Sequence, residues 1–237
     1  MNKGSLYMIP TTIGEIQDSP ENFIAPSNLK TTINLNHFIV EKIKTTRRFL
    51  RKLDSTFDID NTTFYELNKH TNPSEIHAFL QPCREGKNIG MISESGCPAI
   101  ADPGAKIVAL AHKENIKVIP LIGPSSIFMA LMASGLNGQN FSFHGYLPID
   151  KNEKIKKIKS LARSCNNSSS QIFMETPFRN DSLLNDLITY CNENLMLCIA
   201  CSISTSDEYI KTLPIRKWGK NKPSLNKKPV IFILGKN

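Results

Sequence analysis

Residues 89–126 read IGMISESGCPAIADPGAKIVALAHKENIKVIPLIGPSS and decide the fold. The segment Asn88–Ser93 is short and apolar at most positions, which is typical of a parallel strand covered on both faces. It ends in the loop Glu94–Pro98, where glycine and proline allow the backbone to bend close to a ligand. The stretch therefore begins with a buried strand that runs into a sharp loop.

A helix and a second strand–loop–helix unit follow. Asp102 and the proline after it predict a helix start, as an N-cap and a first-turn residue, and Asn115 predicts the left-handed end of that helix. Ile116–Ile122 predicts the next strand, and Gly123–Ser126 turns directly into an apolar helix, Ile127–Ser134. Both loops then lie at the carboxyl ends of parallel strands, where open α/β sheets bind their ligands.

The rest of the chain continues the alternation of apolar segments and helical patterns. Before residue 88 the expected strands are Ser5–Pro10, Asn36–Val40 and Thr62–Leu67, and the expected helices are Ile24–Asn34 and Lys42–Leu53. One further helix should open at Asn72 and bury Ile76, Phe79, Leu80 and Cys83, with a kink at Pro82. After Gly135 the expected elements are strands over 141–143, 171–174, 195–203, 207–213 and 229–234, and helices over 151–164 and around Leu183–Cys191.

The two halves of the chain differ in pattern. Parallel β–α–β units give way near residue 120 to a mixed order of strands and helices, and no long linker separates them. We therefore expect an α/β protein with two α/β domains, residues 1–119 and residues 120–237, and a cofactor cleft between them.

Basic residues gather in three segments. The formal net charge is +8, and Lys and Arg concentrate in residues 42–52, 151–163 and 211–237. Such patches can follow the phosphates of a nucleic acid. Lys is abundant throughout, however, so solvated surface is the alternative reading, and RNA gains modest support.

The six cysteines form no metal or disulfide framework. Cys198 and Cys201 make a C-x-x-C, but an odd spacing on a strand points the two thiols to opposite faces. They read as small core residues of a protein in a reducing cytoplasm. We expect no metal, no signal peptide and no membrane span, since the most apolar window, 118–136, is broken by proline and glycine.

Several motifs resemble those of the tetrapyrrole methylase superfamily. They are S-E-S-G-C-P-A-I-A-D-P-G from Ser93, P-L-I-G-P-S-S from Pro120, H-G-Y-L-P from His144 and E-T-P-F-R from Glu175. Within the superfamily they are most similar to the branch that methylates a ribose 2′-hydroxyl of small-subunit ribosomal RNA. The chain contains no G-x-G and no P-loop, so a conventional dinucleotide-type methyltransferase is not expected.

The resemblance implies S-adenosylmethionine as the cofactor, bound in the cleft between the domains. The residues it assigns to the cofactor are Gly14, Ser93, Glu94, Ser95, Gly96, Pro98, Ile100, Ser125, Ser126, Met174 and Cys201. We expect Gly96→Val to block the cofactor with little effect on folding if the glycine has a negative φ. The resemblance also implies a homodimer, and the run Ile127–Met132, apolar on every side, needs burial.

Three arginines and three glutamates are the residues that bear on the methyl acceptor. Arg47, Arg48 and Arg179 are the candidates for binding RNA, although Arg179 can instead form an internal ion pair with Glu175. Glu41, Glu94 and Glu175 are the carboxylates near the loops, and no catalytic residue is assigned among them.

Two departures from the branch bear on the substrate. Its E-D-T-R is replaced by Glu41-Lys42-Ile43-Lys44, and its G-R-E-L-T by Ala200–Ser204. We therefore expect a cytoplasmic RNA methyltransferase and keep two alternatives. One is a C-methyltransferase for a small tetrapyrrole, and the other is an inactive S-adenosylmethionine-binding regulatory protein.

Overall fold

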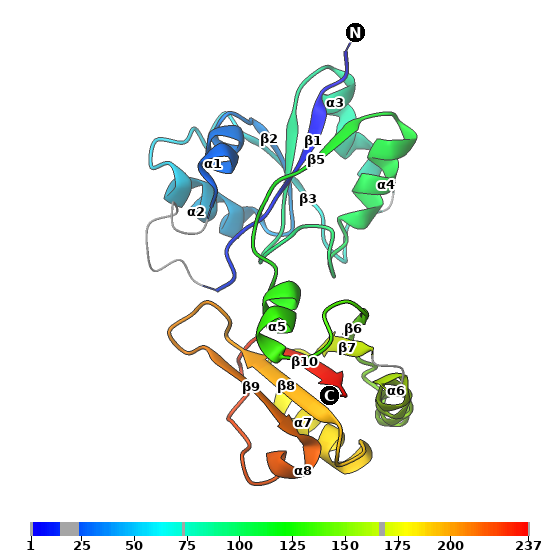
Figure 1. The fold of residues 1–237 in the computed structure, drawn as a ribbon. Coiled ribbons are helices and arrows are strands. Elements are labelled where there is room, and N and C mark those ends of the chain that lie inside the picture. Colours follow the sequence, from blue (N-terminus) through cyan, green and yellow to red (C-terminus); the bar gives the residue numbers. More distant parts are fainter. Residues whose placement is uncertain (1, 15–23, 73, 166–168, 237) are drawn as a thin grey trace. The chain divides into compact units, whose positions relative to one another are not determined.

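The structure is a computed structural model that describes residues 2–14, 24–72, 74–165 and 169–236. It divides into two compact units, an N-terminal unit, Met1–Ser125, and a C-terminal unit, Ser126–Asn237. Each unit carries its own five-stranded sheet with helices packed on it (Figure 1). Two α/β units are therefore confirmed, while the domain boundary between residues 119 and 120 stays a prediction.

The sheet of the N-terminal unit is entirely parallel, with strand order β3-β2-β4-β1-β5. Its strands are β1 (Ser5–Ile9), β2 (His37–Val40), β3 (Thr63–Glu66), β4 (Ile89–Ile92) and β5 (Lys117–Pro120). Its helices are α1 (Pro26–Ile33), α2 (Ile43–Leu53), the 3₁₀ helix η2 (Ile76–Leu80), α3 (Gln81–Arg84) and α4 (Ala105–Lys113). All five strands lie within the segments predicted for them.

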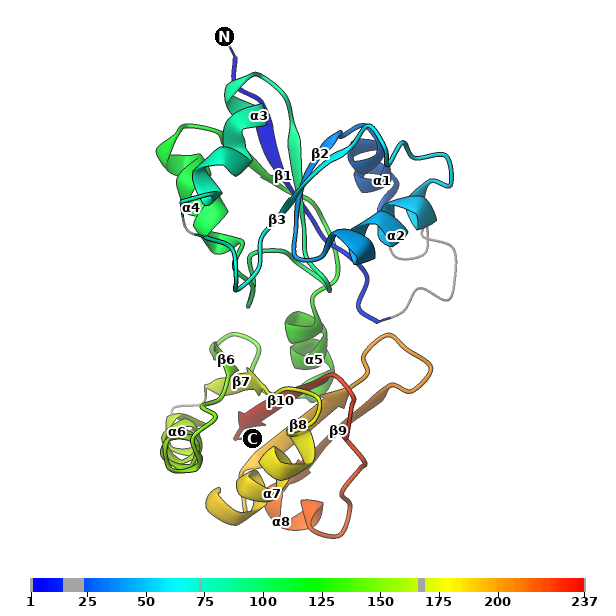
Figure 2. The ribbon, with the colours of Figure 1, turned by 180° about the vertical axis from the view of Figure 1, so that it is seen from behind.

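Helices cover both faces of this sheet. Figures 1 and 2 show α1 and α2 on one face and α3 and α4 on the other. One apolar cluster joins α1 and α2 to the sheet through residues such as Phe38 and Leu50, and a second joins η2, α3 and α4 to it through residues such as Leu80 and Ile107. A strand such as β4, buried at every position, must be apolar throughout, which explains its sequence.

The helix expected after Asn72 is two shorter elements. The turn Ile76–Leu80 is 3₁₀, and Pro82 stands in the first turn of the separate helix α3. The predicted kink at Pro82 was therefore wrong. A proline in a first turn costs no hydrogen bond, because the amide it lacks would have no partner in the helix.

The start of α4 also differs from the prediction. The helix begins at Ala105 behind Gly104, and Asp102 does not cap it in the expected way. Instead, both carboxylate oxygens of Asp102 accept from the Ala99 amide at 2.9 Å, and Oδ1 also accepts from the Gly104 amide at 2.7 Å. Asp102 thus fixes the loop before the helix. The expected end is confirmed, since Asn115 has φ +52°.

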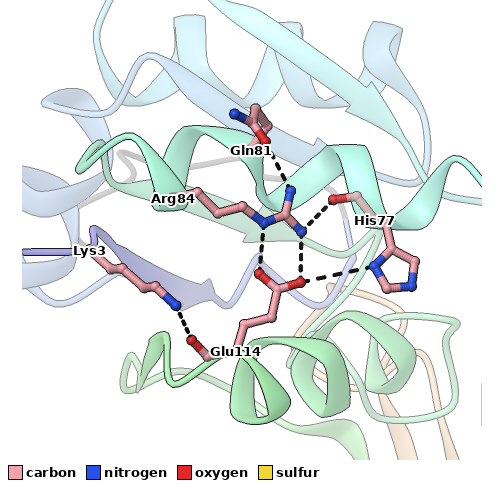
Figure 3. Close-up of polar contacts among 5 residues, drawn as sticks. All are labelled: Lys3, His77, Gln81, Arg84 and Glu114. Carbon is pink, nitrogen blue, oxygen red and sulfur yellow. Dashed lines mark hydrogen bonds and ion pairs between the residues drawn. The ribbon is translucent and has the colours of Figure 1, made fainter. Parts of the chain in front are cut away.

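An ion-pair network closes the amino-terminal edge of this sheet (Figure 3). Arg84 donates to both carboxylate oxygens of Glu114, through Nε at 2.8 Å and Nη2 at 2.7 Å. It also donates to the His77 carbonyl at 2.9 Å, and Lys3 donates to the Glu114 carbonyl. These contacts join η2, α3 and the end of α4 at the edge opposite to the loops predicted to bind ligand.

The sheet of the C-terminal unit is mixed, with strand order β6-β7-β10-β8-β9. Only β6 and β7 pair in parallel, and the other neighbours are antiparallel. Its strands are β6 (Phe141–Tyr146), β7 (Ser170–Met174), β8 (Met196–Cys201), β9 (Tyr209–Pro214) and β10 (Val230–Gly235). Its helices are α5 (Ser126–Ser134), α6 (Lys151–Ser164), α7 (Asn180–Tyr190) and α8 (Ile215–Trp218).

The two faces of this second sheet carry separate cores. One core includes residues of α6, α7 and α8, with Cys201 from the sheet, and the other includes residues of α5, with Cys198 from the sheet. The two thiols thus point to opposite faces, as predicted. Both are free and buried, and because they lie in different cores their side chains do not meet at one site.

Strand β6 is longer than predicted. The strand was expected over residues 141–143, but it continues to Tyr146 across an irregularity between Phe143 and Tyr146. Gly145 has φ +64°, which fits a bulge that lets pairing with β7 resume at Tyr146. Because the bulge interrupts the alternation of apolar and polar residues, the sequence pattern did not predict this extension.

Candidate functional site

The topology of the N-terminal unit marks one place for a ligand. β1 and β4 are neighbours in the sheet, but β1 leads to α1 on one face and β4 leads to α4 on the other. Their outgoing loops therefore separate at the carboxyl edge. In open α/β sheets, this switch point is where ligands bind.

The loops at this switch point are bonded to each other. The Thr11 amide donates to the Gly96 carbonyl at 2.9 Å, and the Ser93 hydroxyl donates to the same carbonyl at 2.9 Å. The loop after β5 also joins them, because a Cβ on Gly123 would lie 2.2 Å from Cβ of Pro10. Three strand ends thus meet in one tightly connected group of loops.

The loop after β4 has an unusual backbone. Gly96 has φ +68°, and Ala99 and Ala101 have φ +66° and +63°. A left-handed alanine is sterically unfavourable and persists only where its surroundings hold it. Asp102 provides that support through its bonds to the loop amides, and burial raises the pKa of its carboxyl. Strain of this kind concentrates at ligand-binding loops.

A cavity of about 350 Å³ opens beside these loops, entirely within the N-terminal unit. Thr11, Thr12 and Gly14 line it from the loop after β1, and Ile92, Ser93 and Glu94 line it from the end of β4. The opposite wall is helix α2, with side chains of Thr45, Thr46, Arg48, Phe49 and Lys52. The volume falls in the range of about 300–1,000 Å³ that is usual for small-molecule sites.

Glu94 connects the β4 loop to α2. Its Oε2 accepts from the Thr45 hydroxyl at 3.3 Å and lies 3.5 Å from Nζ of Lys42. Its amide donates to Oε1 of Glu41 at 3.2 Å. Burial raises the pKa of Glu41. Thr45 and Lys42 therefore hold the carboxylate of Glu94 toward the start of α2, while Glu41 holds its amide.

Known proteins resemble this chain along nearly its full length. A ribosomal RNA small subunit methyltransferase I from Buchnera aphidicola subsp. Schizaphis graminum is 33% identical over 238 residues, which span 99% of this chain and 79% of that protein. The chain belongs to the ribosomal RNA small subunit methyltransferase I family. It is therefore a methyltransferase. The family member from Vibrio cholerae is 29% identical over 213 residues, covering 89% of this chain and 68% of that protein. No family model matches the chain.

Solved structures show the same fold at low sequence identity. The methyltransferase CobJ superposes with a TM-score of 0.64 at 16% identity, over 98% of this chain and 94% of that one. The cobalt precorrin-4 methyltransferase CbiF gives a TM-score of 0.62 at 14% identity over the same shares of the two chains. The tetrapyrrole methylase fold expected from the motifs is thereby confirmed.

The family motifs of the N-terminal unit fall at the switch point. Gly14, Ser93 and Glu94 line the cavity. The other residues assigned to the cofactor in this unit lie in the loops after β4 and β5, and they are Ser95, Gly96, Pro98, Ile100 and Ser125. Pro98 is buried, whereas Ser95 and Ile100 are exposed, so the loop presents the side chains of Ser95 and Ile100 to solvent.

Three residues assigned to the cofactor belong to the C-terminal unit. Ser126 is the first residue of α5, Met174 ends β7 and Cys201 ends β8. Met174 packs with the core under α5, whereas Cys201 is 1% exposed in the core under α6 and α7. Their side chains face opposite sides of the sheet, so a ligand that meets one side chain can meet the other residue only through its backbone.

The three predicted RNA-binding arginines have different environments. Arg48 lines the cavity, whereas Arg47 lies 3.9 Å from Asp60 in an exposed ion pair. Nη2 of Arg179 donates at 2.6 Å to Oε1 of Glu175, whose side chain is 1% exposed. The internal ion pair considered for Arg179 is therefore present. Glu175, one of the three carboxylates near the loops, is therefore engaged by Arg179.

Of the α2 residues that line the cavity, only Arg48 was predicted from the sequence to bind a ligand. Thr45, Arg48 and Lys52 follow one another at spacings of three and four residues, which places them on one helix face. That spacing was a readable signal once the helix was predicted. Among the described residues, no cluster of three potential metal ligands occurs, and no helix is long and apolar enough to cross a membrane.

Proposed function

We propose that this chain methylates a ribose 2′-hydroxyl of small-subunit ribosomal RNA and uses S-adenosylmethionine as the methyl donor. The observation that carries the proposal is the 33% identity, over 99% of the chain, to a protein named ribosomal RNA small subunit methyltransferase I. The switch-point loops, which carry the family motifs of the N-terminal unit, would bind the cofactor at the edge of the adjacent cavity.

The residues at the switch point fit this cofactor. Gly96 is buried and left-handed, so no side chain occupies the place where the β4 loop bends, and the loop from Ser93 to Ile100 offers main-chain groups and hydroxyls. The cofactor would be held by Gly14, Ser93–Gly96, Pro98, Ile100 and Ser125. The Glu94 carboxylate would accept a hydrogen bond from the amino group of the cofactor. Ser126, Met174 and Cys201 stay predicted contacts from the C-terminal unit.

S-adenosylmethionine supplies a methyl group already activated on a sulfonium. The protein then has to align the acceptor oxygen and exclude competing water. A ribose hydroxyl loses its proton as it is methylated, and that proton can pass to a base or to solvent. We assign no general base, because Glu175 is ion-paired in the core and Glu94 is already engaged by Thr45 and Lys42.

We also propose that the enzyme is cytoplasmic and acts as a homodimer. Six free cysteines suit a reducing compartment. Phe128 and Met132 leave an apolar face of α5 exposed, which a second copy could cover.

The function is tested by transfer of a tritiated methyl group. Small ribosomal subunits from cells that lack the ribose modification are incubated with the protein and labelled S-adenosylmethionine, and the RNA is then digested to nucleosides. We expect label in a 2′-O-methylated nucleoside. A tetrapyrrole precursor is assayed in parallel, and label there but not in RNA would establish the small-molecule alternative. Cofactor binding by calorimetry without any transfer would establish the regulatory alternative.

A further inference from the structure

Helix α2 gives the cavity a basic wall. Arg48 and Lys52 are one helical turn apart and both line the cavity, together with Thr45 and Phe49. The facing loops add the hydroxyl residues Thr11 and Thr12. The cavity therefore combines two cationic side chains with several hydroxyl groups.

The acidic group in the cavity does not cancel this charge. Glu94 is the carboxylate among the lining residues, and its Oε2 lies 3.5 Å from Nζ of Lys42, which is not a lining residue. Lys42 therefore offsets the charge of Glu94 from outside. Arg48 and Lys52 place positive charge on the α2 wall of the cavity, and this favours an anionic ligand.

The neighbouring arginine provides an internal contrast. Arg47 is one residue from Arg48 but points elsewhere, into the exposed pair with Asp60, and its side chain is 52% exposed. The basic character of α2 is thus divided between a cavity face and a solvent face. The two faces can be tested separately by single substitutions.

We propose that this cavity holds one ribose–phosphate unit of the substrate RNA, with the phosphate on Arg48 and Lys52. Guanidinium and ammonium groups bind phosphate oxygens through charge-assisted hydrogen bonds, and hydroxyl side chains suit a sugar. The Glu94 edge of the same cavity belongs to the loop proposed to bind the cofactor. The inference rests on the proposed function and names the residues that hold its acceptor.

The experiment compares Arg48→Ala with Arg47→Ala in the full chain. The substrate is the small ribosomal subunit that lacks the ribose modification, and the readouts are KM, kcat and the salt dependence of KM. We expect Arg48→Ala to raise KM about tenfold and to lower the slope of log KM against log salt by about 0.7–0.9, as for the loss of one phosphate contact. Lys52→Ala should act in the same direction, and Arg48→Lys should recover part of the loss.

Arg47 was the other α2 candidate for binding RNA, and this proposal assigns the phosphate to Arg48 instead, because Arg48 lines the cavity and Arg47 pairs with Asp60. Arg47→Ala is therefore the matched control and should leave KM within about twofold. Calorimetry should give the same S-adenosylmethionine affinity for wild type and for all four variants, which also shows that they are folded. Equal effects of Arg47→Ala and Arg48→Ala, or no effect of Arg48→Ala, would overturn the proposal.

Failure of the proposed function would look different. In that case wild type itself would transfer no methyl group to RNA. If wild type instead methylates the tetrapyrrole precursor, and Arg48→Ala impairs that reaction, the anion in the cavity is a carboxylate and the RNA assignment is overturned.

Discussion

Glu94 connects the β4 loop to α2 through a single side chain. Its Oε2 accepts from the Thr45 hydroxyl on α2 and lies 3.5 Å from Nζ of Lys42, the residue before that helix. This side chain thus couples the proposed cofactor loop to the helix that lines the cavity. A change in this side chain should be felt first in cofactor binding.

We predict that Glu94→Gln weakens S-adenosylmethionine binding about tenfold, because an amide lacks the charge that attracts the amino group of the cofactor. At saturating cofactor, kcat should change by less than about threefold. Calorimetry and steady-state kinetics measure the two effects. Glu41→Gln is the control, since its remaining carbonyl oxygen can still accept from the Glu94 amide. A kcat loss of about a hundredfold at full saturation would instead make Glu94 the proton acceptor.

Gly96 corrects an expectation about substitution. Gly96→Val was expected to spare folding if φ were negative, but φ is +68°, and a Cβ there would lie 3.3 Å from the Pro124 carbonyl. We predict that Gly96→Ala lowers the free energy of unfolding by about 1–2 kcal/mol, measured by urea titration. Gly138→Ala is the control, because a Cβ there meets nothing within 4 Å and should change stability by less than about 0.5 kcal/mol.

An ion pair joins α3 to the end of α4 at the amino-terminal edge of the sheet in the N-terminal unit. Arg84 makes a two-bond ion pair with Glu114, and the two side chains are 29% and 20% exposed. The hydrogen bonds from Arg84 lower the pKa of Glu114. A carboxyl with a lowered pKa in the folded state stabilises the fold above its unfolded pKa and loses that contribution as pH falls.

We predict that Arg84→Ala lowers the free energy of unfolding by about 1 kcal/mol at pH 7. The difference from wild type should shrink as pH falls through about 4.3, where unfolded glutamate becomes protonated. Urea titrations from pH 7 to pH 3.5 measure it. Lys87→Ala removes a more exposed pair with Glu85, whose pKa is lowered by a hydrogen bond from Gln81 and also by Lys87, so its pH dependence should have the same sign and be smaller. A constant difference across the pH range would contradict the role given to Glu114.

Element positions followed from the sequence where local signals agreed. Helix α6 has the predicted bounds, because Asp150 caps it by accepting from the Glu153 amide at 2.9 Å. The break between η2 and α3 was missed, since proline can end one helix or begin the next. The opposite orientations of Met174 and Cys201 depend on their pairing with Ile231 and Val230 of β10, and such long-range register is not readable from either strand alone.

The cavity was only partly predictable for the same reason. The loop motifs identified Ser93 and Glu94, and the basic helix identified Arg48. That they share one cavity depends on how α2 packs on the sheet, through Phe49 and Leu50. Packing of this kind is set by the whole unit. The sequence therefore predicted individual residues of the site, but not that they line the same cavity.

At the level of the whole protein, α5 is the element with an unexplained surface. Ala130 and Leu131 are buried, but Phe128 is 51% exposed and Met132 is 83% exposed. The two exposed residues are four positions apart and so lie on one face of the helix. An exposed apolar face of this kind commonly marks a protein interface.

We predict that wild type sediments as a homodimer at micromolar concentration and that Met132→Glu shifts it to monomer, because the interface would have to bury a charge. Met132 is the preferred site, since Phe128 also makes an edge contact with Phe141 at 6.0 Å and its loss would disturb the fold. Phe178→Glu is the matched control, a charge placed at a residue that is 74% exposed elsewhere in the same unit. Sedimentation velocity and the far-UV circular dichroism of each variant separate dissociation from unfolding. A wild type that sediments as a monomer refutes the dimer, and a Met132→Glu variant that stays folded and dimeric refutes this face as the interface.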